Sequence, residues 1–156
     1  PEPPVVLAAW RALFDGRPLD WLNPGSRSSW RVDAGVLVPI PSGSRSAIQS
    51  AEEFGDGDLR IRFEIKGGLD SAYVAVRQGA EGKAWLRVEG EFLNSIAPGA
   101  HELLFQQRGD EIKALFDGKP IALAREGTPS RRGRIQLNCT GDGLGILAVE
   151  WRDAKP

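Results

Sequence analysis

The stretch DLRIRFEIK (residues 58–66) decides the fold class, because it alternates apolar and charged residues with a period of two. Successive side chains of a β-strand point to opposite faces, so the pattern predicts a strand with one buried face and one face in water. A shift of one residue would bury the charges, which fixes the register. We therefore expect the apolar residues to be buried, namely Leu59, Ile61, Phe63 and Ile65, and the charged ones to be exposed, namely Arg60, Arg62 and Glu64.

Similar short runs recur on both sides of this strand, with turn residues between them. They cover residues 30–32, 35–38, 45–50, 71–78, 83–89, 101–107, 111–116, 134–139 and 145–151. Residues 108–110 and 116–119 predict hairpin turns, the second because its Asp-Gly pair tolerates positive φ at both central positions. Several strands at this spacing are typical of an all-β sandwich or barrel. Residues 5–13 leave a helical turn and extended structure equally open, and residues 124–132 are expected to form a surface loop.

The length and composition predict one globular domain. The 156 residues are 41% hydrophobic and 26% charged, which argues against a disordered chain. We expect a single domain over residues 1–156, with the sandwich at about 10–151 and a terminal extension at 1–9. The sequence begins at Pro1 without a Met. We therefore expect a domain excised from a larger protein, or a processed product.

Charge and residue counts argue against several kinds of ligand. The 20 basic and 21 acidic side chains leave a formal net charge of −1, so we expect no nucleic-acid binding. No apolar run approaches the roughly 20 residues of a membrane helix, so we expect no membrane insertion by this domain. One Cys and one His do not supply the usual zinc ligands, so we expect no metal site and no cofactor. The oligomeric state stays open.

Motifs of the common hydrolases are missing from the sequence. A Ser-His-Asp or Cys-His nucleophile needs a neighbouring base, and the only histidine, His101, is accompanied by no Gly-x-Ser-x-Gly motif. We therefore predict a structural or surface role for His101. Glycoside hydrolysis uses paired carboxylates. Glu89 and Glu91 are the candidates for such a pair, because their two-residue spacing places them on one face of a strand.

The best functional candidate is one face of a sheet. If Val74 and Val76 point into the core, Tyr73 and Arg77 point outward. The same alternation predicts further outward residues in two other strands, namely Trp85, Arg87 and Glu89 in one and Arg134, Gln136 and Asn138 in the other. Aromatic rings can stack on a sugar and planar polar groups can bind its hydroxyls, so Trp85 is the expected main contact of a carbohydrate. The alternative, in which Tyr73 and Trp85 are packed under a loop and the charges are merely solvated, stays open.

The order of segments resembles that of a known family. ALFDGRPLDW (residues 12–21) followed by WRVDAGVL (residues 30–37) is similar to the opening of the 3-keto-disaccharide hydrolase domain family. The similarity continues through FGDGDL (54–59), AYVAVR (72–77), FDGKP (116–120) and GRIQL (133–137), and so covers about residues 10–151. The resemblance implies a concanavalin-like jelly-roll sandwich of two antiparallel sheets, with Arg77 carried over as a site residue. It also implies an extracytoplasmic bacterial protein that acts on sugars or binds them.

Two motifs of the catalytic family members are missing. These members usually carry a strand with a Glu-x-Gln motif and then a Trp-Asn motif, whereas the corresponding stretches here are KAWLRVE (83–89) and PGAHE (98–102). We therefore expect a degenerate member, a non-catalytic module that binds or senses a carbohydrate or another small polar ligand. Two alternatives stay open. One is a hydrolase of 3-keto-glycosides that uses Glu89 or Glu91, and the other is a structural or protein-contact domain without a small ligand.

Overall fold

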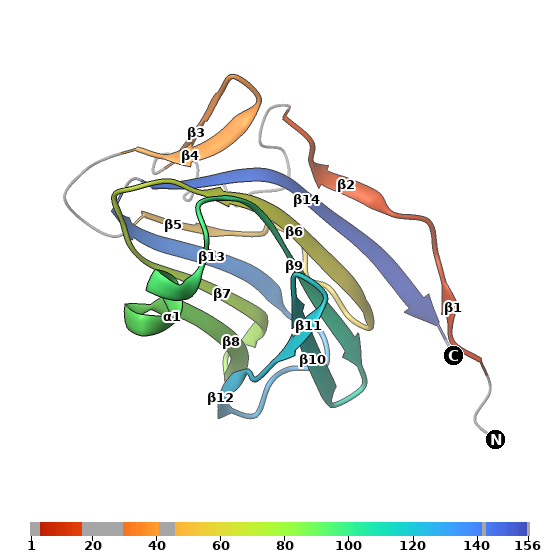
Figure 1. Cartoon of the computed structure of the whole chain (residues 1–156). Helices are drawn as coiled ribbons and strands as arrows, with labels where there is room; N and C mark the ends of the chain where they lie inside the picture. Colours follow the sequence, from red (N-terminus) through yellow and green to blue (C-terminus); the bar gives the residue numbers. More distant parts are fainter. Residues whose placement is uncertain (1–3, 17–29, 41–45, 142, 156) are drawn as a thin grey trace.

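The computed structural model describes residues 4–16, 30–40, 46–141 and 143–155, and these form two antiparallel β-sheets that face each other (Figure 1). The small sheet has the order β12-β8-β7-β13-β5. Its strands are β5 (Ser46–Gln49), β7 (Leu69–Gly79), β8 (Gly82–Glu89), β12 (Ala124–Gly127) and β13 (Arg134–Gly141). A short helix, α1 (Gly90–Ser95), follows β8 at one end of this sheet.

The large sheet contains nine strands within the described residues, in the order β11-β10-β9-β6-β14-β4-β3, and β1 and β2 also pair with β14. The strands are β1 (Val6–Leu7), β2 (Arg11–Phe14), β3 (Trp30–Asp33), β4 (Val36–Pro39), β6 (Gly57–Ile65), β9 (Gly99–Arg108), β10 (Glu111–Phe116), β11 (Lys119–Ile121) and β14 (Leu144–Lys155). The predicted all-β class is confirmed. In the part of the chain described, no helix is long and apolar enough to cross a membrane.

Strand β6 lies in the middle of the large sheet, and its period-two pattern has the predicted register. The four apolar residues are buried, from Leu59 at 0% exposure to Ile65 at 8%. Arg62 is exposed as expected, whereas Arg60 and Glu64 are half-buried. Arg60 is partly covered because it donates two hydrogen bonds to Glu150 of the neighbouring strand and lies against the ring of Trp10.

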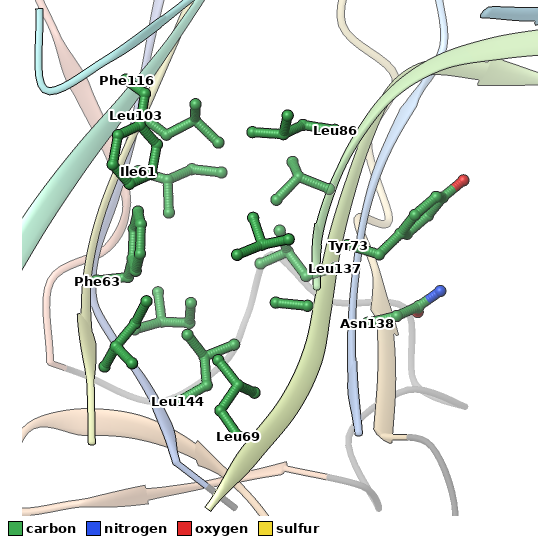
Figure 2. Close-up of a pocket in the computed structure, with 15 residues that line it drawn as sticks. Ile61, Phe63, Leu69, Tyr73, Leu86, Leu103, Phe116, Leu137, Asn138 and Leu144 are labelled. Carbon is green, nitrogen blue, oxygen red and sulfur yellow. The ribbon is translucent and has the colours of Figure 1, made fainter. Parts of the chain in front are cut away.

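The core fills the space between the sheets. Apolar side chains of the large sheet, such as Ile61, Phe63 and Leu103, face Leu86 and Leu137 of the small sheet (Figure 2). They leave a cavity of only about 30 Å³, so the interior is packed as a protein core is expected to be.

The two predicted hairpin turns are confirmed. Strands β9, β10 and β11 pair as consecutive antiparallel neighbours. The turn between β10 and β11 has φ values of 49° at Asp117 and 80° at Gly118, as a type I′ turn requires. This turn brings the Asp117 side chain back to the start of β9, where it accepts a hydrogen bond from the backbone N–H of Glu102 at 2.8 Å.

Long-range pairing decides the structure of two other segments. Residues 5–13, where a helical turn and extended structure were equally open, contain β1 and all of β2 but its last residue, and both strands pair along β14 (Figure 1). Residues 124–127, expected in a loop, form the edge strand β12 against β8. In both cases a long neighbouring strand offers backbone donors and acceptors, and this long-range pairing outweighs a weak local preference.

Candidate functional site

A polar groove with a volume of about 360 Å³ lies on the small sheet, over β7, β8 and β13. We call it the small-sheet groove. Its lining is mostly polar and contains one aromatic side chain: Ser71, Ala72, Tyr73, Gln78, Lys83, Arg87, Glu89, Gln136, Asn138, Cys139 and Thr140. Four of the predicted site residues are among them, namely Tyr73, Arg87, Glu89 and Gln136.

The strand register gathers these side chains around Tyr73. Tyr73 is directly opposite Arg87 on one neighbouring strand and Asn138 on the other. Directly paired residues present their side chains on the same face of a sheet, close enough to touch. Period-two placement on three adjacent strands therefore produces one continuous patch, as the alternation in the sequence predicted.

Several polar atoms at this groove are buried and have no hydrogen-bond partner among the described residues. They are the hydroxyl of Tyr73, Oδ1 of Asn138 and Oε1 of Gln78. Asn138 is only 6% exposed. Figure 2 shows that Tyr73 and Asn138 point away from the apolar interior, so both side chains extend to the groove side of the sheet. Buried polar groups are normally satisfied, so these atoms are suited to accept hydrogen bonds from a bound molecule.

Two cationic side chains lie close to the aromatic ring of Tyr73. Nζ of Lys83 is 5.2 Å from the ring centroid, and the guanidinium carbon of Arg87 is 5.9 Å from it. Their carboxylate partners are distant for ion pairs. Nζ of Lys83 is 3.7 Å from a carboxylate oxygen of Glu126, and a guanidinium nitrogen of Arg87 is 3.9 Å from one of Glu89. Exposed pairs of this kind contribute little free energy, so both cations can exchange these partners for a ligand.

Trp85 lies beside the small-sheet groove and is not part of its lining. Its ring centroid is 6.4 Å from that of Tyr73, and Nζ of Lys83 lies 5.6 Å from the Trp85 ring. The side chain is half-buried, and its strand β8 is bordered there by β12. Tyr73 is therefore the aromatic residue at the centre of the groove, and Trp85 is its neighbour at the edge.

The two candidate carboxylates are not brought together in the groove. Glu89 lines it, at the end of β8. Glu91 belongs to the first turn of α1 and is exposed outside the lining. The expectation that both lie on one strand face fails because β8 ends at Glu89 and Gly90, with φ of 57°, turns the chain into the helix.

The placement of Arg77 corrects the predicted face. Arg77 is 2% exposed and points inward, where its guanidinium donates to Oε1 of Gln107 at 2.7 Å and to Asp56 at 3.0 Å. It also donates to three backbone carbonyl oxygens, those of Gly55, Gly109 and Ser130. Burial lowers the pKa of this guanidinium below its usual value, and the charge of Asp56 partly opposes that change.

A bulge explains why the alternation fails at this point. The register between β7 and β8 shifts between Val76 and Gly79, and Arg77 adopts a φ of 53°. An inserted residue reverses which side chains point outward beyond the bulge. Gln78 therefore takes the outward place in the groove that the sequence pattern gave to Arg77. The glycine that follows, Gly79, is the only local sign of the irregularity.

Sequence reasoning also left several lining residues out of the site. Lys83 lies two residues before Trp85 in the same strand and therefore on the same face as Trp85, Arg87 and Glu89. The alternation that selected those three could also have selected Lys83. The alternation predicts Asn138 on the same outer face as Gln136, although it was not among the expected ligand contacts. Ser71 and Thr140 carry small side chains with no chemical signal of their own, and only the register places them opposite each other.

Among the described residues, His101 and Cys139 are not paired with each other as nucleophile and base, and the partners of His101 are Asp117 and Ala97. Nδ1 of His101 lies 2.6 Å from Asp117, and Nε2 lies 2.6 Å from the carbonyl oxygen of Ala97. Burial alone would lower the pKa of His101, but the hydrogen bonds to Asp117 and Ala97 outweigh it, so the pKa is raised. Burial raises the pKa of the Cys139 thiol to about 11, so it carries almost no nucleophilic thiolate near neutral pH.

The fold and its strand order define the class: the chain is a concanavalin-like jelly-roll sandwich of two antiparallel sheets, as expected. A protein from Parabacteroides distasonis, provisionally assigned as a glycosyl hydrolase, superposes with a TM-score of 0.71 at 13% identity over 94% of this chain and 100% of that one. A Bacillus licheniformis β-glucanase gives a TM-score of 0.58 at 13% identity, over 80% and 82% of the two chains.

The carbohydrate-binding module CBM66 from Bacillus subtilis gives a TM-score of 0.54 at 15% identity, over 93% of this chain and 92% of the module. At these identities the similarity shows the fold alone. The sequence itself matches no family profile and no curated relative. The resemblance to the 3-keto-disaccharide hydrolase domain family therefore stays a hypothesis.

Proposed function

We propose that this protein is a non-catalytic carbohydrate-binding module and that the small-sheet groove is its binding site. The observation that carries the proposal is the set of buried, unpartnered polar atoms around Tyr73, above all Oδ1 of Asn138. A sugar carries many hydroxyl groups, which can donate to such acceptors. Specific binding sites combine a few placed polar groups with apolar or aromatic surface, and this groove has both.

The similar structures support a carbohydrate ligand. One of them is provisionally assigned as a glycosyl hydrolase, and two others are named as a β-glucanase and a carbohydrate-binding module, so both an enzyme and a binding module use this sandwich. The resemblance to the 3-keto-disaccharide hydrolase domain family carries two further parts of the proposal, a bacterial origin and a place of action outside the cytoplasm.

The carboxylates of the groove favour binding over hydrolysis. The usual glycosidase mechanisms use two carboxyl groups on either side of the scissile bond. In the described part of the groove lining the only carboxylate is that of Glu89, and it lies 3.9 Å from Arg87. The alternative, a hydrolase of 3-keto-glycosides, requires a second acid that these lining residues do not supply.

A glycan array followed by calorimetric titration tests the proposal. We expect a saccharide to bind to the wild type, and Asn138→Ala and Tyr73→Ala each to lower the affinity about tenfold, since each variant removes a hydrogen bond and Tyr73→Ala also removes the ring. Arg62→Ala, on the exposed outer face of the large sheet, is the control and should bind as the wild type does. Absence of binding across the array would leave the structural or protein-contact alternative.

Trp85→Ala decides whether the aromatic at the groove's edge also contacts the sugar. We expect a loss of affinity if the indole stacks on the saccharide, with Trp10→Ala as the matched aromatic control on the other sheet. An unchanged affinity with a lowered melting temperature would make Trp85 a packing residue.

Incubation with 3-keto-disaccharides and their unoxidised parents, with Glu89→Gln as the comparison, tests hydrolysis directly. Release of monosaccharide by the wild type alone would contradict a non-catalytic role.

A further inference from the structure

We infer that the small-sheet groove selects anionic sugar residues, those that carry a carboxylate or a sulfate ester, over neutral ones. This inference rests on the proposed function, since it names the class of saccharide that the same groove would take. The observation that carries it is the position of Lys83 and Arg87 beside the groove's central aromatic ring.

The charges of the groove are unequal. Its charged lining residues are two cations, Lys83 and Arg87, and one anion, Glu89. The neighbouring strand β12 contributes Glu126, which is 67% exposed and contacts Lys83 from outside the lining. The remaining lining side chains that carry hydrogen-bonding groups are uncharged amides and hydroxyls. The lining itself, which does not include Glu126, therefore carries more positive than negative charge.

The cations are placed to serve a ligand. Lys83 is the more enclosed of the two, with 27% of its side chain exposed. Its amine lies over two aromatic rings, those of Tyr73 and Trp85, where contact with water is reduced. Arg87 is 55% exposed and presents a planar fork of donors, which matches the two oxygens of a carboxylate. An anion that contacts both Lys83 and Arg87 would form stronger electrostatic interactions with them than the distant protein carboxylates do.

A neutral sugar would find less open aromatic surface here. Stacking of a sugar on an aromatic ring needs direct access to the ring face, and Lys83 lies over the rings of both Tyr73 and Trp85. A neutral ligand would have to displace this amine, and it could not replace the cation–π interaction of the amine with the two rings. An anionic ligand can keep the amine in place and pair with it, while its hydroxyls donate to Asn138 and Gln78.

The first experiment compares matched sugars by calorimetric titration. The probes are oligosaccharides of galacturonic, glucuronic and mannuronic acid, each against the neutral oligosaccharide of the same linkage, and sulfated galactose oligosaccharides against their unsulfated forms. We expect at least one anionic probe to bind about tenfold or more tightly than its neutral partner. The affinity should fall as salt is raised, since exposed charges are screened.

Three charge variants show whether the groove is responsible. Lys83→Gln and Arg87→Gln should each lower the affinity for the preferred anionic probe about fivefold or more, and leave the neutral partner within about twofold. Glu89→Gln should raise the affinity for the anionic probe about two- to fivefold, because it removes a like charge. Lys113→Gln, an exposed paired lysine on the large sheet, is the matched control and should change nothing.

The outcomes separate the inference from the proposed function. Preference for an anionic probe, lost in Lys83→Gln and Arg87→Gln, supports the inference, and comparison of the uronate and sulfate arms identifies the charged group. Binding of neutral probes as tight as that of anionic ones, with no effect of the charge variants, overturns the inference and leaves carbohydrate binding intact. Absence of binding by every probe, with all variants folded, overturns both.

Discussion

The outer faces of the two sheets carry similar side chains but differ in how these are paired. On the large sheet, the buried carboxylate of Asp58 accepts hydrogen bonds from Arg108 at 2.8 Å and from Arg152 at 2.7 Å. Next to it, Arg60 donates to both carboxylate oxygens of Glu150. Every charge named here has a close partner within the chain.

The small sheet has the opposite character. In the small-sheet groove, Lys83 and Arg87 are 3.7 Å or more from their carboxylate partners, and the polar atoms of Tyr73 and Asn138 have no partner among the described residues. The same alternation of polar and apolar residues thus produces a closely paired charge cluster on one face and an incompletely paired groove on the other. Groups satisfied internally stabilise the fold, whereas groups left unsatisfied are suited to binding.

Substitution of a carboxylate on each face should produce the largest difference in the free energy of unfolding. Asp58→Asn leaves Arg108 and Arg152 without their shared anion in a partly buried place, and should lower the free energy of unfolding by about 3 to 5 kcal/mol. Glu89→Gln in the groove should change it by less than about 0.5 kcal/mol. Urea unfolding of the two variants measures both. Equal effects would remove the distinction between the faces.

Arg77 and Arg87 provide the second comparison, because the sequence pattern placed both on the same face. Arg77→Lys keeps the charge but loses the planar fork that holds Gln107, Asp56 and three carbonyl groups, so we expect a loss of about 2 to 3 kcal/mol in the free energy of unfolding. Arg87→Lys should be nearly neutral for stability. Saccharide binding should be retained in folded Arg77→Lys, and a selective loss of binding there would return Arg77 to the site.

Tyr73→Phe removes only the hydroxyl group and should lower the affinity for the saccharide without lowering the stability of the fold. Without ligand, the hydroxyl has no partner among the described residues. Its removal should therefore leave the melting temperature unchanged or slightly raised. Affinity for the saccharide should fall about three- to tenfold, since the hydroxyl would be paired in the complex. A clear drop in melting temperature would mean that the hydroxyl is already satisfied in the free protein.

The smallest effect concerns the pH dependence of the large sheet. The raised pKa of His101 contributes stability that is fully present below its ordinary value of 6.5 and is lost as pH rises through the raised value. Burial alone would raise the pKa of Asp117, but the hydrogen bond from His101 and the other contacts outweigh it. The lowered pKa of Asp117 contributes stability above its ordinary value of 3.8, which is lost as pH falls through the lowered value.

The pair should therefore stabilise the fold most between these two ordinary values, by less than about 1 kcal/mol because Asp117 is 44% exposed. The measurement is urea unfolding of the wild type and Asp117→Asn across this range and at about pH 8.5. Asn suits the positive φ of this turn, so the variant isolates the charge. A difference between the two proteins that is independent of pH would show that the ion pair contributes nothing.

The sequence predicted the parts of this molecule that depend on unbroken alternation. The burial of β6 followed from its pattern, and Tyr73, Arg87, Glu89 and Gln136 lie together in the groove because their strands keep the period of two through these positions. The position of Arg77 could not be predicted in this way, because the bulge beside it reverses which side chains point outward. Gly79 is the only residue in the local sequence that indicates this bulge. Residues 5–13, for which a helical turn and extended structure were equally open, contribute to strands because they pair with β14, which is far away in the sequence.

Other features arise only from three-dimensional packing. The alternation could place Asn138 on the outer face, but it could not show that Oδ1 of this residue has no partner, because that depends on three strands at once. Nor could it show that Lys83 reaches the rings of Tyr73 and Trp85. The preference of the groove for an anionic sugar is therefore an inference from the structure.

The most direct test of the account is to map the bound saccharide onto the two faces by amide chemical-shift perturbation in ¹⁵N-labelled protein. We predict that titration with the best-binding oligosaccharide shifts the amides of β7, β8 and β13, centred on Tyr73, Arg87 and Asn138, and leaves those of β6, β9 and the middle of β14 unchanged. Shifts centred on the large sheet would contradict the assignment of the small-sheet groove as the binding site.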